Sequence, residues 1–419
     1  MRHLACTAAT VLLTSLFAVG NPPRLLRAVV NSQVSPNPIN SIVLTRAVLR
    51  RFTMMGVPAA SSNPAYLTAR EWPRLLREAK HGNKKAQLRV AFQFKKGEVV
   101  KQDFTQALKW FSEAAKQGEP IAEGNLGLMY YLGQGVDRNP TAAAQWFERA
   151  ASQGLPEAQF DIAYLYKMGI GVPQNLGRAF DLFREAAESG YAPAQNNLAR
   201  MYEKGDGIAR DPAAAVIWFM KAARQGDDIA ELNLAVMYSQ GIGIPLDQQK
   251  AAEWTERAAK QGYTKAQTAL AELYLGGWGV PQDDHLAAFW LDKAASQGDA
   301  TAQTKLALLY LNGRGVAHDD GIGAMWLSKA AEQGQHDAQA KLAMLYESGR
   351  GVSRDLNRAY IWRLLSLEES SEQNDELSNL AHQMTDDDVA DAKRRASEWR
   401  VGHKAAAPTE LDLVAPTIP

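Results

Sequence analysis

The stretch that decides the fold is residues 119–154, which read EPIAEGNLGLMYYLGQGVDRNPTAAAQWFERAASQG. In its first part, Leu126, Met129 and Tyr130 recur at the spacing of one face of an α-helix. Gly133 follows this run and predicts its end, because glycine readily takes the left-handed conformation that closes many helices. The first half of the stretch therefore predicts one short amphipathic helix and a turn.

The second half predicts another helix. Asn139 is a good N-cap, since its short side chain can accept a hydrogen bond from the free N–H groups of the first turn. Pro140 suits the first helical position, where a missing N–H costs nothing. Trp146 and Ala150 lie on the apolar face, and we expect the tryptophan to fill the space between neighbouring helix pairs. Each 36-residue stretch therefore predicts a hairpin of two antiparallel helices.

The landmarks of this hairpin return every 36 residues without any insertion. The closing glycines are Gly82, Gly118, Gly154, Gly190, Gly226, Gly262, Gly298 and Gly334. The tyrosines are Tyr130, Tyr166, Tyr202, Tyr238, Tyr274, Tyr310 and Tyr346, with Phe94 in the first slot. The tryptophans are Trp110, Trp146, Trp218, Trp254, Trp290, Trp326 and Trp362, with Leu182 as the exception. The cap residues are Asp103, Asn139, Asn175, Asp211, Asp247, Asp283, Asp319 and Asp355. Residues 83–370 therefore form eight repeats.

Such an array predicts an all-α fold, a right-handed superhelical solenoid of helix hairpins. Each short hairpin buries its apolar face only against its neighbours, so the terminal repeats need caps. Residues 64–82 predict an N-terminal capping helix, and residues 371–403 predict capping helices at the other end. Thr385 is the expected N-cap of the last helix.

The repeat resembles that of the Sel-one-like repeat (SLR) family, which is related to the tetratricopeptide repeat. A representative copy is Leu126-Gly127, Tyr130, Gly133, Gly135-Val136, Trp146, Ala150-Ala151 and Gly154. The departures are Val99 for the second turn glycine, Leu182 for tryptophan and Gly323 for alanine. The resemblance implies an adaptor or scaffold that assembles protein complexes, often in bacterial envelopes, in signalling or in host interaction. It names no partner.

By hairpin geometry and by analogy with tetratricopeptide arrays, the variable positions of the first helices line a concave groove. We expect Leu128, Tyr131, Phe160 and Tyr164 to form the main anchor patch for a partner protein or peptide, edged by Arg200. The alternative is that these side chains only pack against neighbouring hairpins.

Enzymatic chemistry has little support in the sequence. The Gly-x-Gly pairs all occupy the turn of the repeat, so no phosphate-binding loop is expected. His318 and His336 are the one histidine pair with acidic neighbours, and we expect both to be solvated surface residues rather than metal ligands. We therefore expect no catalytic residue, cofactor or metal. The alternative, an envelope enzyme or carbohydrate-binding protein acting on cell-wall material, rests on the groove candidates Glu157, Tyr164, Glu203 and Glu272.

The amino-acid composition excludes several other classes of protein. The 46 basic and 46 acidic residues cancel, which argues against nucleic acid as the partner. The single cysteine, Cys6, excludes an intrachain disulfide, and no apolar run after residue 20 is long enough for a membrane span. The neutral total hides an asymmetry, because residues 1–70 contain seven arginines and no acidic residue, leaving 39 basic against 46 acidic residues beyond them. We expect a monomer.

The N-terminal segment allows three interpretations. Residues 1–20 have the order of a secretory signal peptide, with an apolar stretch followed by small residues, and predict an exported, periplasmic or secreted protein. The arginine-rich, acid-free composition is also that of a mitochondrial transit peptide. A start at Met54 or Met55 would instead give a cytoplasmic protein. Residues 21–63 are expected to be a linker, and residues 404–419 a disordered tail.

Overall fold

The computed structural model describes residues 70–367 and 375–406, which form 19 α-helices and contain no strand. The first helices of the hairpins are α5 (Lys84–Lys96), α7 (Pro120–Leu132), α9 (Pro156–Met168), α11 (Ala192–Lys204), α13 (Asp228–Gln240), α15 (Thr264–Gly276), α17 (Ala300–Asn312) and α19 (His336–Ser348). The second helices are α6 (Phe104–Ala115), α8 (Pro140–Ser152), α10 (Leu176–Glu188), α12 (Pro212–Arg224), α14 (Gln248–Lys260), α16 (Asp284–Ser296), α18 (Asp320–Glu332) and α20 (Leu356–Ser366). The remaining helices are α4 (Trp72–Lys80), α21 (Asp375–Ala381) and α22 (Asp386–Ala406).

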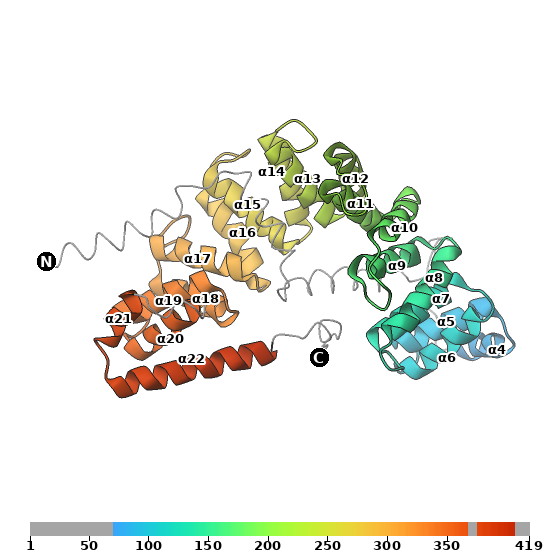
Figure 1. The fold of residues 1–419 in the computed structure, drawn as a ribbon, viewed down its shortest axis with the longest axis horizontal. Coiled ribbons are helices and arrows are strands. Elements are labelled where there is room, and N and C mark those ends of the chain that lie inside the picture. Colours follow the sequence, from blue (N-terminus) through green and yellow to red (C-terminus); the bar gives the residue numbers. More distant parts are fainter. Residues whose placement is uncertain (1–69, 368–374, 407–419) are drawn as a thin grey trace. The chain divides into compact units, whose positions relative to one another are not determined.

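The labelled helices follow one another along the chain as antiparallel neighbours (Figure 1). They group into two compact units, each with four complete hairpins. The N-terminal unit comprises described residues 70–227, from α4 to α12, and the C-terminal unit comprises the described residues from 228 onward, from α13 to α22. Within each unit, every first helix packs on its own second helix, and that second helix packs on the first helix of the next hairpin. The predicted all-α solenoid of helix hairpins is confirmed.

Local capping defines where each second helix begins. All eight predicted cap residues accept a hydrogen bond from the backbone N–H three residues later, as in Asn139 Oδ1 to the Ala142 N–H at 3.0 Å. The N–H of the same cap residue also donates to the carbonyl of the tyrosine slot, at 2.8 Å between Asn139 and Tyr130. These two bonds fix the turn between the helices, so the predicted caps are confirmed.

The turn glycines serve two different purposes. Gly133 has φ +70° and donates from its N–H to the Met129 carbonyl, which ends α7 in the left-handed conformation that glycine favours. Gly135 lies against the preceding hairpin, where an added Cβ would come within 2.5 Å of the Phe104 carbonyl oxygen. The second glycine is therefore required by close packing between hairpins as well as by its own backbone angle.

The core of the second helices differs from the expectation in one respect. The tryptophans were expected to fill the space between neighbouring helix pairs, and Trp146 and Trp218 do pack against the hydrophobic cluster of the preceding hairpin. Most of the tryptophans are nevertheless only half-buried, and Trp218 has the Lys221 ammonium 3.7 Å from its ring centroid. The buried position is the next residue along the helix, which we call the core slot: Phe111, Phe147, Phe183, Phe219, Thr255, Leu291, Leu327 and Arg363. The half-buried tryptophans therefore lie at the rim of their hairpins, where cationic side chains can cover their polarisable faces.

A packing reason accounts for the departure at Gly323. An added Cβ there would lie 2.7 Å from the Leu311 side chain of the preceding helix α17. Most other repeats carry a polar residue where Leu311 lies, and all the others carry alanine where Gly323 lies. The glycine therefore lets the Leu311 side chain pack close to the backbone of α18.

The ends of the array are covered by extra helices. α4 buries Leu75 and Ala79 in a cluster with α5 and α6. At the other end, Ala392 and Ala396 of α22 are buried against α20, and Thr385 accepts a hydrogen bond from the Asp388 N–H. The expected signal peptide (1–20), linker (21–63) and most of the expected tail (404–419) lie outside the described residues.

Candidate functional site

The anchor patch expected from the sequence comes from three successive first helices of the N-terminal unit. Leu128 and Tyr131 lie on α7, Phe160 and Tyr164 on α9, and Arg200 on α11. The first four belong to one hydrophobic cluster, whereas Arg200 lies outside it. The structure therefore brings the apolar part of the expected patch together.

Most of this apolar group is covered. Leu128, Tyr131 and Phe160 are 4%, 8% and 7% exposed, while Tyr164 is half-buried. The Phe160 ring makes edge contacts with Phe183 of α10 and with Tyr191 just before α11, at centroid distances of 5.3 and 5.6 Å. Phe160 therefore has a packing role between hairpins, and Tyr164 and Arg200 are the more accessible members of the five.

Two cations lie on the same two first helices as Tyr164 and Arg200: Arg200 itself on α11, and Lys167 on α9, three residues after Tyr164. Lys167 is in the last turn of α9, and burial, followed by the nearby charge of Arg200, lowers the pKa of its ammonium to about 8. Its nearest carboxylate is Asp206, at 3.9 Å. Among the described residues, the Arg200 guanidinium has no hydrogen-bond or ion-pair partner. This end of the first-helix surface therefore carries cationic charge with little internal compensation.

A third cation of the N-terminal unit is deeply buried. The Lys95 ammonium of α5 donates to Asn125 Oδ1 of α7 at 2.8 Å. Burial, with a smaller contribution from the charge of Lys96, lowers its pKa to about 7. This bond also shows that the first helices of adjacent hairpins lie next to one another.

The first helices of the C-terminal unit compensate their charges internally. The Lys305 ammonium of α17 lies 3.0 Å from the Glu272 carboxylate of α15, and Lys341 pairs with Asp337 on α19. Glu272, a candidate for carbohydrate or enzyme chemistry, is thus engaged in an ion pair and lies in a different unit from the other candidates, Glu157, Tyr164 and Glu203.

Neighbouring hairpins are joined by a row of buried glutamines that our sequence reasoning missed. Gln195 of α11 donates to the Ala187 carbonyl of the preceding hairpin at 3.0 Å and accepts from Gln225, at the end of α12, at 2.8 Å. The same accepting bond, across 30 residues, is made by Gln87, Gln267 and Gln303. The signal was available, because these glutamines keep the 36-residue period.

Glutamate replaces this glutamine twice, and each time an arginine compensates it. Glu123 binds Arg149 at 2.9 Å and Gln153 at 2.6 Å, although its side chain is 1% exposed. Glu231 binds Arg257 at 3.1 Å and Gln261 at 2.7 Å. Burial raises the pKa of Glu231, opposed by the charge of Arg257. Both groups are structural, because their polar atoms are directed at one another between the two helices of one hairpin.

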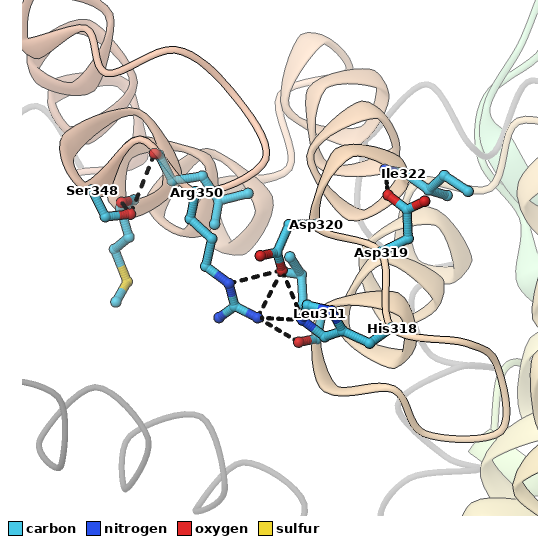
Figure 2. A network of polar contacts seen from close by, with 9 residues as sticks. Leu311, His318, Asp319, Asp320, Ile322, Ser348 and Arg350 are labelled. Atoms are coloured by element: carbon cyan, nitrogen blue, oxygen red, sulfur yellow. Dashed lines mark hydrogen bonds and ion pairs between the residues drawn. The ribbon is translucent and has the colours of Figure 1, made fainter.

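A further polar network joins hairpins in the C-terminal unit (Figure 2). Arg350, in the turn after α19, donates to Asp320 at 2.8 Å and to the Leu311 carbonyl at 2.5 Å. His318 lies 3.1 Å from both Arg350 and Asp320. His336 is not part of this network and contacts the Ser366 carbonyl at 3.2 Å. The two histidines therefore do not form a pair.

Arg314 repeats this arrangement one hairpin earlier, where its guanidinium binds Asp284 at 2.6 Å and the Leu275 carbonyl at 3.1 Å. Since the arrangement recurs without a histidine, its role is to hold hairpins together. In the described part of the chain, no three His, Cys, Asp or Glu side chains are grouped so that they could hold a metal ion. None of the helices in that part is long and apolar enough to cross a membrane.

Comparison with known proteins identifies the same 36-residue repeat. The Sel1 repeat model matches eight consecutive segments, residues 84–119, 120–155, 156–191, 192–227, 228–263, 264–299, 300–335 and 336–364. A Sel1 repeat protein from Oxalobacter formigenes is similar over 80% of this chain and 99% of its own, with 28% identity and a TM-score of 0.56. The c5321 protein of uropathogenic Escherichia coli, a protective antigen with an SLR fold, is similar over 94% of this chain and 98% of its own, with 25% identity and a TM-score of 0.45. No curated protein matches the sequence.

Proposed function

This chain belongs to the Sel1 repeat family, and we propose that it is a non-enzymatic scaffold that binds a partner protein or peptide on the first helices of its N-terminal unit. Sel1 repeat proteins mediate protein interactions. One observation supports this choice of surface. Tyr164 of α9 is half-buried at the edge of the apolar cluster of Leu128, Tyr131 and Phe160, and Arg200 lies on the next first helix, α11. Aromatic and arginine side chains in such positions are the usual anchors of protein interfaces.

The three buried members have a supporting role in this proposal. Phe160 holds α9 against α10 and the start of α11, which positions Tyr164 on the same helix. A substitution at Phe160 would therefore disturb packing as well as binding, so Tyr164 is the better residue to change.

The test is a selection of binding peptides from a random library displayed on phage, with the purified full chain as bait. We expect selected peptides to lose at least about tenfold in affinity for Tyr164→Ala, because an interface aromatic is worth more than about 1.4 kcal/mol. Phe289→Ala is the matched control, since Phe289 is an exposed aromatic on the second helix α16. Equal binding to wild type and to Tyr164→Ala would reject the surface, and failure to select any peptide would reject the function.

The alternative class, an envelope enzyme or carbohydrate-binding protein, has weaker support. Its candidate Glu272 is paired with Lys305, and the pair lies in the C-terminal unit. Turnover of a cell-wall substrate by the purified chain, abolished by Glu157→Gln, would favour that class over the scaffold.

We propose export as the setting, on the order of apolar and small residues within 1–20. The cytoplasmic signalling adaptor and the mitochondrial protein are the competing settings. Sequencing the N-terminus of the mature protein separates them: Asn21 supports export, whereas a first residue near Met55 contradicts it. Sedimentation of the purified chain tests the expected monomer.

A further inference from the structure

Lys167 reaches from the last turn of α9 to the end of α11, where its ammonium lies 3.9 Å from the Asp206 carboxylate. Arg200 lies on α11 itself, one turn before the end of that helix. Their charges interact unfavourably, since Arg200 is the largest of the charges that lower the pKa of Lys167. Lys204, at the end of α11, adds to this repulsion, and Asp206 at 3.9 Å is the one carboxylate that acts against it. Like charges that are partly desolvated are costly unless an anion lies between them.

The nearby acidic side chains do not neutralise Arg200. Glu203 lies one turn along α11, and Asp161 lies two turns before Lys167 on α9, yet neither forms an ion pair with Arg200 in the described part of the chain. In the C-terminal unit, the first-helix cations Lys305 and Lys341 both have a carboxylate partner. The repeat itself therefore does not require uncompensated cations on its first helices.

We propose that Lys167 and Arg200 bind the carboxylate of an aspartate or glutamate side chain in a partner peptide. The planar guanidinium of Arg200 can donate two parallel hydrogen bonds to one carboxylate, and Lys167 adds a second positive charge. Partial burial strengthens both contacts relative to a fully exposed site. The site rests on the proposed scaffold function and specifies the chemistry of its partner.

The position of Tyr164 adds a second requirement on the partner. Tyr164 precedes Lys167 by three residues on α9, so both side chains lie on neighbouring positions of one helix face. A peptide that fits both would carry an apolar or aromatic residue close in sequence to its acidic residue.

The experiment uses peptides selected from the random phage library on the full chain, synthesised with a fluorescent label and titrated by anisotropy. We expect the selected sequences to be enriched in Asp or Glu beside an apolar residue. Arg200→Gln is expected to weaken binding by about tenfold or more, and so is changing the peptide's acidic residue to its amide. Combining both changes should add little, because they remove the same contact.

Arg178→Gln is the matched control, since Arg178 is an exposed arginine on the second helix α10, and it should bind like wild type. Lys167→Met gives an independent second variant, and unchanged thermal unfolding shows that each variant is folded. Selected peptides without acidic residues, or equal binding to Arg200→Gln, overturn the carboxylate site while leaving the scaffold function standing if Tyr164→Ala still abolishes binding. If no peptide is selected, both proposals fail.

Discussion

The N-terminal and C-terminal units share one backbone repeat but hold their hairpins together by different means. In the N-terminal unit the core slot of the second helix is always phenylalanine: Phe111, Phe147, Phe183 and Phe219. In the C-terminal unit the same slot is Thr255, Leu291, Leu327 and Arg363. The C-terminal unit has instead the arginine bridges of Arg314 and Arg350, which reach back to the preceding hairpin.

This difference shows which parts of the repeat can be exchanged. The caps, the turn glycines and the glutamine row persist in both units, because they satisfy backbone groups and close contacts that every hairpin creates. The size of the core-slot side chain and the number of ion pairs between hairpins vary. A smaller core side chain reduces the free energy of unfolding, and an added ion pair between hairpins can offset that reduction. The charged residues of the first helices also vary, and Arg200 in the N-terminal unit has no carboxylate partner in the described part of the chain, whereas Lys305 and Lys341 in the C-terminal unit each have one.

The largest effect is expected from the core slot. Phe183→Ala should reduce the free energy of unfolding by about 3–5 kcal/mol, because it removes a fully buried ring that contacts Phe160. Thr255→Ala in the C-terminal unit should cost about 1 kcal/mol, for the hydrogen bond of its hydroxyl to the Ala251 carbonyl. Urea unfolding combined with native-state hydrogen exchange measures both, and equal costs would remove the proposed difference between the cores.

A smaller, pH-dependent effect is expected in the N-terminal unit. The pKa of Lys95 is about 7 in the folded chain and near its ordinary 10.5 when unfolded, so the unfolded state binds more protons between these values. Stability should therefore rise between pH 7 and pH 9, by up to about 2 kcal/mol. Lys95→Met should abolish this rise, whereas the exposed neighbour Lys96→Met should retain it. A rise that survives in Lys95→Met would contradict the burial of this ammonium.

The buried glutamates should behave alike in both units. Arg149→Ala leaves Glu123 buried with its hydrogen bond from Gln153 but without the arginine, and should cost about 1–2 kcal/mol, with a similar cost for Arg257→Ala beside Glu231. Lys221→Ala is the control, because the corresponding buried residue there is the neutral Gln195. Thermal unfolding of the three variants checks this, and an equally large loss for Lys221→Ala would show that the glutamate is not the cause.

The smallest effect is expected from the arginine bridges. Arg350→Ala should cost about 1 kcal/mol, since both Arg350 and Asp320 are partly exposed, and the loss should shrink at high salt. Arg210→Ala in the N-terminal unit removes a bond to the Glu203 carbonyl without an ion pair, so its cost should not depend on salt. Unfolding at low and high salt separates the two, and a salt-independent Arg350→Ala would contradict the role given to Asp320.

The sequence was sufficient for the hairpin, the period and the caps, because these depend on interactions within a few residues. It was less informative about helix orientation. A shift of one position along the second helix separates Trp218 from Phe219, and the apolar pattern accommodates either as the core residue. The glutamine row could have been found from its period, but its partners lie 30 residues apart and become evident only when the two helices of a hairpin are packed together.

The candidate site was harder to predict because its positions do not repeat. Leu128, Tyr131 and Phe160 were chosen as exposed anchors, yet each is largely covered in the structure. Whether a variable apolar residue faces solvent depends on the size of its neighbours in the adjacent hairpins, such as Phe183 and Tyr191 around Phe160. The sequence placed Arg200 at the edge of the anchor patch. Its electrostatic repulsion with Lys167 could not be predicted, because it depends on how α9 and α11 are arranged in space.

Hydrogen exchange of the full chain, with and without a selected peptide, locates the surface on which a partner binds, which we propose to be the first helices of the N-terminal unit. We expect slower exchange in α9 and α11, where Tyr164, Lys167 and Arg200 lie, with little change in α15, α17 and α19. Protection confined to the C-terminal unit, or to the second helices, would contradict it.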